Sequence, residues 1–435
     1  MALRPLGKRQ ICKPPLPEGH SRAKKGGVKV PHLVVAEIVA GLREVFAQGR
    51  HADKVIEYAF KQHRKWGSRD RRLYAESLYD CVRHWRWLWH VAGLPDAQHD
   101  RGDNLSAQDT WMVWAAYWLL NKGPWPEFDE LKGLPAEQWL ERSRQSVAPA
   151  LRFSWPDWLD AHASSELPST WPQWREVLNE AAPVYLRANT LKTTRRALRE
   201  RLATEGVAVE PIKEVTTALQ LTQRCWLFGL PSFREGLFEL QDAASQQVAP
   251  ALEVEPGMRV IDACAGGGGK TLHLAALMQN RGRILALDVH GWKLEELRRR
   301  CRRAGVDIVE TRLIENSKSV KRLQDSADRL LLDVPCSGMG VLRRNPDAKW
   351  KLSPEQLQRL ELEQATILER YSAMVKVGGK MVYATCSILP AENERQIERF
   401  LSTRAGSWEL EQQWHSEPQS QGWDGFFAAR LRRIS

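Results

Sequence analysis

Two cysteines of this chain stand in turns that directly follow predicted β-strands. Cys336 lies in "DVPCSGMG", after a proline and before a glycine-ended turn, and Cys386 lies in "YATCS". Asp333 ends the strand that precedes the first of these turns. A thiolate can add to an electrophilic carbon and leave it again, so we interpret both cysteines as reactive groups that share a cleft with a carboxylate.

The other cysteines do not have this placement. The chain has 7 cysteines, an odd number, without a C-x-x-C pair or a cluster with histidine. This pattern predicts neither a disulfide framework nor a zinc site, and we expect no bound metal. Four of them are interpreted as small buried apolar residues: Cys12, Cys81, Cys225 and Cys301.

A glycine-rich loop, "DACAGGGGKT", could hold a ligand through its backbone amides. It does not match the triphosphate loop G-x-x-x-x-G-K-[ST], because Cys264 takes the place of the first glycine, and it does not match the dinucleotide pattern G-x-G-x-x-G. Asp288 ends the next predicted strand, where a carboxylate can bind ribose hydroxyls. The loop and this acid favour S-adenosylmethionine as the cofactor. The predicted contacts are Cys264, Ala265, Gly266, Gly267, Gly268, Gly269, Lys270 and Asp288.

These residues need a scaffold, and strands alternate with helices over the last part of the chain. Strands are predicted in "RVIDACA", "RILALDV", "VETRLIENS", "RLLLDVP" and "GKMVYATCS", with helices over 292–304 and 354–375. The alternation predicts a doubly wound parallel sheet that binds ligands beyond the carboxyl ends of its strands. The first of these helices carries arginines that are expected to face solvent: Arg298, Arg299, Arg300, Arg302 and Arg303.

The first part of the chain is predicted to be helical. Apolar residues recur at helical spacing in "VVAEIVAGLREVFAQGRHADKVIEYAFKQH" and "RDRRLYAESLYDCVRHWRWLWHVAG". Most of the 19 tryptophans fall in this region, and we interpret them as the core of a helical bundle. The alternative is that those of "HWRWLWH" stack on bases of a single strand.

Charge and hydropathy narrow the class of protein. The net charge is +11, and residues 1–29 are rich in lysine and arginine, which predicts a flexible basic tail and favours a nucleic-acid partner. The longest strongly apolar run, "WMVWAAYWLL", is too short to cross a bilayer, and no signal peptide is recognised. We expect a monomeric, cytoplasmic protein that does not associate with membranes.

A small module lies between the helical and the alternating parts. "VYLRANTLKTTRRALRERLATEGVAVEPI" predicts a strand, a helix and a return strand, which is typical of a small α/β unit. The expected organisation is multidomain, with the basic tail over 1–29, an all-α domain over 30–165, the small α/β module over 166–248 and the cofactor-binding α/β domain over 249–435.

Five motifs together resemble one family. "DACAGGGGKT", "LDVPCSGMG", "ATCS", "RANTLK" and "ELQDAAS" are similar to those of the Nol1/Nop2/Sun family of RNA cytosine-5 methyltransferases, and most similar to its bacterial 16S ribosomal RNA members of the Fmu/Sun, RsmB-like type. The resemblance covers residues 30–435, including "RDRRLYAESLYDCVRHWRWL" and a late "DGFF". It implies a NusB-like helical RNA-binding domain, a small module that guides RNA and a Rossmann-like methyltransferase domain.

The resemblance also implies roles at the strand ends. Cys386 would attack C6 of a cytosine, and Cys336 would assist loss of the C5 proton and release of the product. Asp333 would hydrogen-bond the base and border the cofactor. After the third strand, Glu315 is the expected contact to adenine, with Asn316 as the alternative. The family usually has Ala-Pro where this loop has two glycines, a change that loosens the backbone but keeps its amide donors.

Contacts to RNA are expected at two sites. The resemblance assigns Arg187, Asn189 and Lys192 of "RANTLK" to RNA guidance, and Arg343 and Arg344 begin a basic run beside the turn of Cys336. Ribosomal RNA of the small subunit is the expected substrate. Transfer RNA is an alternative substrate, and a non-catalytic RNA-binding ribosome-assembly factor is an alternative function.

Overall fold

The computed structural model describes residues 30–95, 105–316, 320–418 and 422–435. Two compact units meet in the sequence between Ser154 and Trp155. The predicted basic tail, residues 1–29, lies outside the described residues. Within the described ranges, no helix is long and apolar enough to cross a bilayer.

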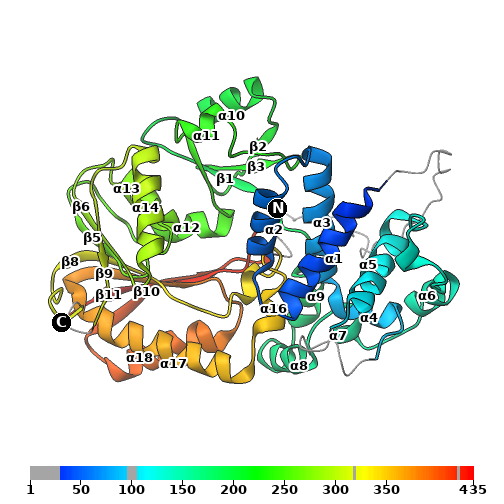
Figure 1. Cartoon of the computed structure of the whole chain (residues 1–435). Helices are drawn as coiled ribbons and strands as arrows, with labels where there is room; N and C mark the ends of the chain where they lie inside the picture. Colours follow the sequence, from blue (N-terminus) through cyan, green and yellow to red (C-terminus); the bar gives the residue numbers. More distant parts are fainter. Residues whose placement is uncertain (1–29, 96–104, 317–319, 419–421) are drawn as a thin grey trace, which may run out of the picture. The chain divides into compact units, whose positions relative to one another are not determined.

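Unit 1, which ends at Ser154, is built from helices in its described part, as predicted (Figure 1). Its core is aromatic: Trp85 and Trp89 are each 1% exposed, and Phe46 stacks on Trp85 with ring centroids 3.9 Å apart. Trp87 is 7% exposed. The tryptophans of "HWRWLWH" therefore fill the core, and the alternative of base stacking is wrong for them. The helices are α1 (His32–Phe46), α2 (Ala52–Gln62), α3 (Ser68–Arg83), α4 (Trp85–Val91), α5 (Ala107–Lys122), η3 (Asp129–Leu131), α6 (Ala136–Ser143) and α7 (Pro149–Arg152).

Unit 2 begins with two short helices and a small antiparallel sheet. The sheet has the strand order β2-β3-β1-β4, and its core includes Leu186, Leu219 and Phe238, together with Leu198 of α10. The expected small α/β module is thus present. Its elements are α8 (Asp157–Glu166), α9 (Trp171–Val177), β1 (Tyr185–Ala188), α10 (Arg195–Thr204), β2 (Val209–Pro211), β3 (Ala218–Leu221), α11 (Pro231–Arg234) and β4 (Phe238–Leu240).

The rest of unit 2 is a seven-stranded sheet of order β10-β11-β9-β8-β5-β6-β7. Strands β9, β8, β5, β6 and β7 are parallel, as predicted, but β11 is antiparallel to both β9 and β10. The sheet is therefore mixed, which corrects the expected parallel sheet. The strands are β5 (Arg259–Asp262), β6 (Arg283–Asp288), β7 (Val309–Leu313), β8 (Ala327–Asp333), β9 (Val375–Thr385), β10 (Trp408–His415) and β11 (Phe427–Arg433).

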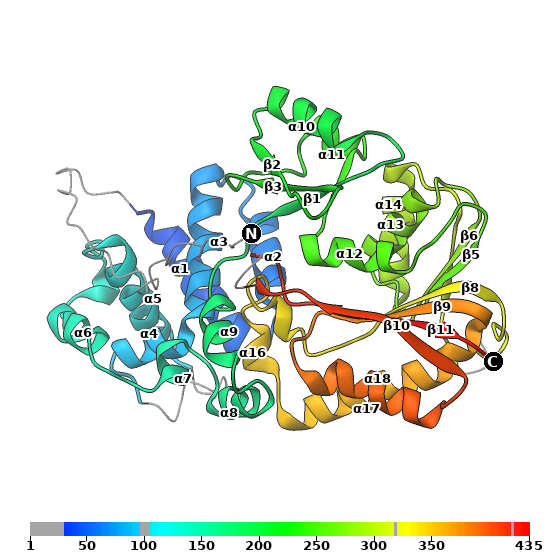
Figure 2. The ribbon, with the colours of Figure 1, turned by 180° about the vertical axis from the view of Figure 1, so that it is seen from behind.

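Helices cover both faces of this sheet (Figures 1 and 2). Alternate residues of β9 point to opposite faces: Val382 and Ala384 join the core beneath α13 and α14, whereas Met381 and Tyr383 join the core beneath α17 and α18. The fold is thus doubly wound. The helices and turns are α12 (Ala243–Ala251), α13 (Gly269–Leu277), α14 (Gly291–Ala304), η4 (Met339–Val341), α16 (Ala348–Lys351), α17 (Pro354–Tyr371), η5 (Ser372–Met374), η6 (Pro390–Glu392) and α18 (Glu394–Thr403).

Candidate active site

The two predicted cysteines lie side by side at the carboxyl ends of β8 and β9. These strands are parallel neighbours whose register pairs Asp333 with Ala384, so the turns that follow them start at the same edge of the sheet. The Sγ atoms of Cys336 and Cys386 are 3.3 Å apart, and both residues are half-buried. The hydrogen bond to Cys386 and burial hold the pKa of the Cys336 thiol well above its usual value. The two thiols are therefore close enough to act on the same substrate.

A buried carboxylate that the sequence analysis missed lies behind the thiols. Glu392 is 0% exposed and accepts hydrogen bonds from Ser337 and Ser387, the residues that follow the two cysteines. The available signal was the repeated Cys-Ser pair in "PCSG" and "TCS". Glu392 could not be recognised from the sequence as the partner of these serines, because a single buried acid in a short turn leaves no repeating pattern of polar and apolar residues.

Lys270 connects the glycine loop to the end of β8. Its Nζ donates to Asp333 Oδ2 at 2.6 Å and lies 5.2 Å from the ring centroid of Phe426. The lysine side chain is 10% exposed and the aspartate side chain 30%. Asp333 thus keeps surface open to a ligand while its orientation is held by a partly buried cation.

The glycine loop follows β5 and leads into α13. Gly266 and Gly268 adopt φ values of 54° and 84°, the left-handed region that favours glycine. A Cβ at Gly268 would lie 2.0 Å from Leu297 Cδ1, so the helix α14 leaves no room for a side chain there. The amide of Gly266 donates to Asp288 Oδ2 at 2.9 Å. The predicted ribose-binding acid therefore also holds the loop in place.

The first residue of the loop motif is a buried acid. Asp262 is 1% exposed, and Thr271 Oγ1 donates to its Oδ2 at 2.7 Å. Burial raises the pKa of Asp262 to about 7 and also raises that of Cys264 well above its usual value. Cys264 packs against the core beneath the loop, so its expected contact with the cofactor would come through its backbone.

Exposed apolar side chains lie at the ends of β6 and β7 and at the start of α14. Val289 is 60% exposed, Trp292 68% and Leu313 38%. Glu315 is exposed in the segment after β7. Apolar side chains beside the predicted ribose-binding acid are suited to a flat, weakly polar ring such as adenine. The donors and surfaces present here therefore fit an adenosine-containing cofactor.

Three predicted RNA-contact residues of the small module instead bind the neighbouring α13 and α14. Arg187 is 3% exposed and donates from Nη1 to Gly269 O at 2.6 Å, inside the glycine loop region. Asn189 is 6% exposed and donates from Nδ2 to Ala304 O at 2.8 Å. Lys192 is exposed, and its Nζ donates to Arg303 O at 2.7 Å. An RNA phosphate cannot reach Arg187 and Asn189, because both side chains are buried.

The two arginines after the turn of Cys336 are also bonded within the protein. Arg343 is 5% exposed and donates to Gly422 O at 3.0 Å. Arg344 pairs with Asp242 Oδ2 at 2.8 Å and with Asp424. The burial of Arg343 excludes the expected phosphate contact in this conformation, and Arg344 ties the "DGFF" segment to the start of α12.

Two arginines of α14 correct the expectation of a solvated helix face. Arg300 and Arg303 both pair with the buried carboxylate of Glu239 on β4, at 2.9 and 2.6 Å. Arg300 Nη1 also donates to Gly267 O at 2.7 Å. The Arg300 guanidinium therefore holds the carbonyl group of Gly267, and Glu239 of the small module fixes the position of that guanidinium.

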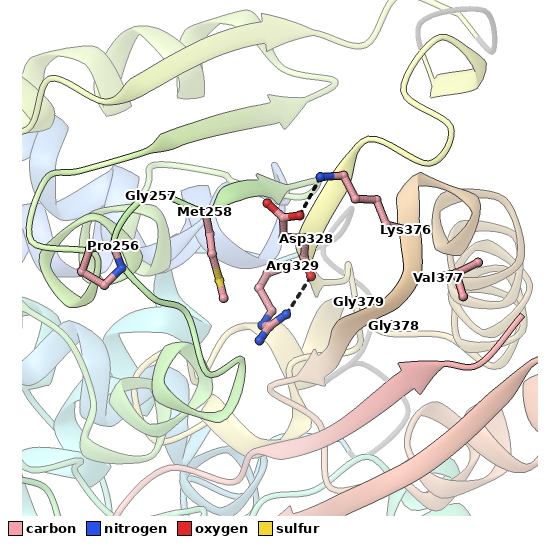
Figure 3. A pocket seen from close by; sticks show the side chains of 9 residues that line it. All are labelled: Pro256, Gly257, Met258, Asp328, Arg329, Lys376, Val377, Gly378 and Gly379. Carbon is pink, nitrogen blue, oxygen red and sulfur yellow. Dashed lines mark hydrogen bonds and ion pairs between the residues drawn. The ribbon is translucent and has the colours of Figure 1, made fainter.

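A pocket of about 580 Å³ lies at the opposite edge of the sheet (Figure 3). It is lined by Pro256, Gly257, Met258, Asp328, Arg329, Lys376, Val377, Gly378 and Gly379. These residues precede or begin β5, β8 and β9, whereas the cysteines follow β8 and β9, so the pocket is separate from the candidate site. In the described part of the chain, no group of His, Cys, Asp or Glu side chains could hold a metal.

Comparisons with known proteins identify relatives of both parts of unit 2. Residues 249–432 match the family described as 16S rRNA methyltransferase RsmB/F, and residues 155–227 match the ferredoxin-like domain described as RsmF/B-like. A protein of Synechocystis sp., the probable ribosomal RNA small subunit methyltransferase B, is 35% identical over 315 residues, which cover 67% of this chain and 69% of its own. The ribosomal RNA small subunit methyltransferase B of Serratia proteamaculans is 33% identical over 305 residues, with 68% and 70% covered. The crystal structure of PH0851 covers 93% of this chain and 99% of its own with a TM-score of 0.78, at 23% identity, and shows the same fold.

Proposed function

The chain belongs to the RsmB/F family of 16S rRNA methyltransferases, and from this premise we propose that it methylates carbon 5 of a cytosine in small-subunit ribosomal RNA. The observation that carries the proposal is the distance of 3.3 Å between the Sγ atoms of Cys336 and Cys386. Carbon 5 of cytosine is a poor nucleophile until a thiolate adds at carbon 6. Two thiols at one strand edge supply that addition and its reversal.

The cofactor is S-adenosylmethionine, which supplies an electrophilic methyl group when bound. Asp288 would hold the ribose, and the backbone of the loop from Cys264 to Lys270 would hold the amino-acid part. Val289 and Leu313 offer apolar surface for adenine, with Glu315 as the proposed polar contact. The left-handed φ of Gly266 supports this assignment, because nothing lies within 4 Å of the position that a Cβ would take there and the backbone stays open to a ligand.

The residues at the strand ends divide the work on the base. Cys386 forms a bond from Sγ to carbon 6, which places electron density on carbon 5. Asp333, held by Lys270, hydrogen-bonds the polar edge of the cytosine and stabilises the adduct. After methyl transfer, the proton on carbon 5 passes to the Cys336 sulfur, which accepts it as a thiolate. The electron pair of that C–H bond restores the double bond between carbons 5 and 6, and the bond from carbon 6 to Cys386 Sγ breaks to release Cys386 as a thiolate. The target base has to leave any stack to reach these groups.

Unit 1 is proposed to be a NusB-like RNA-binding domain. Arg64, Lys65 and Arg69 are exposed around the start of α3, which offers a cluster of cations to phosphates. Their combined replacement by alanine should flatten the dependence of RNA affinity on salt concentration. An unchanged salt dependence would assign RNA binding to another surface.

The cysteines provide the test of the proposed reaction. Cys386→Ala and Cys336→Ala proteins are incubated with S-adenosylmethionine and either small-subunit ribosomal RNA or transfer RNA, and 5-methylcytosine is mapped by bisulfite sequencing. We expect no methylation from Cys386→Ala and an accumulating covalent protein–RNA complex from Cys336→Ala. Cys225 is exposed, unlike the buried Cys81 and Cys301, so the expectation of burial is wrong for it. Cys225→Ala, which changes this exposed thiol outside the site, is the control and should behave as the wild type. Full activity of Cys386→Ala would refute its assignment as nucleophile.

A further inference from the structure

The side chain of Glu392 joins the two turns that carry the thiols. Its Oε1 accepts from the backbone N–H of Ser337 at 2.7 Å and from Gln364 Nε2 at 2.9 Å. Its Oε2 accepts from the hydroxyl groups of Ser337 and Ser387. One carboxylate therefore bonds to the residue directly after Cys336 and to the residue directly after Cys386.

This carboxylate has an unusual setting. It is 0% exposed, and the four donors it accepts from are all neutral groups. Burial of a carboxylate is costly unless its oxygens are hydrogen-bonded, so these four bonds have to form together. A shift of either turn would leave part of the charge without a donor.

Further bonds fix the same pair of turns. Gln364 Nε2 also donates to Pro335 O at 2.9 Å, and the amide of Gly340 donates to Cys386 O at 2.9 Å. The backbone of Glu392 is itself held, since Tyr383 Oη donates to its carbonyl oxygen at 2.7 Å. The glutamate is thus a fixed point between two loops that have no strand pairing to each other beyond Asp333 and Ala384.

We propose that Glu392 is a positioning residue that sets the separation of the Cys336 and Cys386 thiols by clamping their turns. The clamping of the two turns follows from the hydrogen bonds of Glu392 alone. Its consequence for turnover rests on the proposed function, because both thiols then act on one cytosine. None of the four hydrogen bonds to the Glu392 side chain comes from a thiol, so Glu392 acts through Ser337 and Ser387.

The experiment uses Glu392→Gln in the full-length protein, with Ser387→Ala as a milder second variant that removes one donor. The substituted glutamine would keep the shape but present an amide N–H₂ toward groups that now donate to a carboxylate. Glu411→Gln is the matched control: this half-buried glutamate on β10 pairs with Lys380 in the middle of β9 and with Arg430 on β11. The first measurement is cross-linking by dibromobimane, which becomes fluorescent when both of its arms have reacted with thiols, followed by peptide mapping of the Cys336–Cys386 product.

We expect the mapped cross-link to form in the wild type and in Glu411→Gln and to fall in yield in Glu392→Gln, with a smaller fall in Ser387→Ala. In methylation assays, kcat should fall by about 10- to 100-fold in Glu392→Gln, because a displacement of reacting groups by about 1 Å has effects of this size. The KM for RNA should stay within about twofold, since the clamp does not contribute to ground-state binding.

Two results would overturn the proposal. The first is wild-type cross-linking yield and rate in a folded Glu392→Gln protein. The second, if that variant does not fold, is wild-type cross-linking and kcat in Ser387→Ala. Failure of the proposed function is distinguishable, because the cross-linking assay needs neither RNA nor methyl transfer. A wild-type protein that cross-links but does not methylate cytosine would refute the reaction and leave the clamp standing.

Discussion

The ammonium group of Lys270 and the carboxylate of Asp333 are joined at 2.6 Å between the start of α13 and the end of β8. The lysine belongs to the loop proposed to bind the cofactor, and the aspartate belongs to the strand end proposed to bind the base. One partly buried ion pair therefore links the two halves of the site. A substitution in one half of the site should therefore change the function of the other half.

This link predicts non-additive effects of substitution. Lys270→Met and Asp333→Asn should each lower kcat/KM, and the double variant should lose less than the sum of the two. We expect a coupling energy of about 1–3 kcal/mol, because the pair is in direct contact and mostly shielded from water. The exposed pair of Arg196 and Glu200 on α10 is the control, and its coupling should be below about 1 kcal/mol. Additive losses for Lys270 and Asp333 would show that they act independently.

The strand-end residues could be predicted because each follows a run of buried apolar residues. Asp333 and Cys386 mark the ends of β8 and β9, and parallel strands bring their carboxyl ends to one edge of a sheet. The antiparallel strands β10 and β11 were not predicted. Their residues follow the last alternating element, and the stretch 416–426 between them is shorter than a parallel crossover requires.

Long-range bonds of polar side chains could not be predicted. The sequence predicts that Arg187 contacts RNA and that Arg300 faces solvent, because charge alone does not distinguish an exposed from a buried guanidinium. Their carbonyl partners, Gly269 and Gly267, lie 82 and 33 residues away in the chain. The fold has to bring such partners together before their roles become visible.

Arg187 should therefore affect stability rather than salt-dependent RNA binding. Arg187→Met removes a buried donor to Gly269 O and to Gln241 and leaves both half-buried acceptors without it, which should cost about 2–4 kcal/mol in the free energy of unfolding. The slope of log affinity for RNA against log salt should stay unchanged. A phosphate contact would instead lower that slope by about 1. The exposed Arg199 on α10 is the control, and Arg199→Met should change stability by less than about 0.5 kcal/mol.

Gly268 should tolerate no side chain. Gly268→Ala combines a left-handed φ of 84° with a Cβ placed 2.0 Å from Leu297 Cδ1. The Leu297 side chain is fully buried. Gly206→Ala is the matched control, because its φ of 78° is similar but nothing lies within 4 Å of the added Cβ. We expect Gly206→Ala to cost about 1–2 kcal/mol from backbone strain alone and to leave cofactor binding intact.

Calorimetric titration with S-adenosylmethionine separates the two variants. Gly268→Ala should bind the cofactor at least about tenfold more weakly, which corresponds to about 1.4 kcal/mol. Equal stability and equal affinity in both variants would show that Leu297 moves aside, and that the loop does not depend on close contact with α14.

Asp262 predicts a pH dependence of stability. Burial raises its pKa to about 7 in the folded chain, whereas an unfolded aspartate has a pKa of about 3.9. The folded state therefore binds the proton more tightly between these values, and the free energy of unfolding should fall as the pH rises from about 4 to about 7. The full effect of this one group is roughly 3–4 kcal/mol.

Urea unfolding of the wild type and of Asp262→Asn across this pH range isolates the effect. The variant cannot ionise at this position, so its stability should fall less with rising pH than that of the wild type. Asp424 should preserve part of the slope in both proteins, because burial also raises its pKa to about 7. Asp307→Asn, at an exposed position, is the control and should follow the wild-type curve. Parallel curves for wild type and Asp262→Asn would mean that Asp262 is already ionised throughout the range, with its charge held by Thr271 and by the Lys270 ammonium nearby rather than removed by a proton.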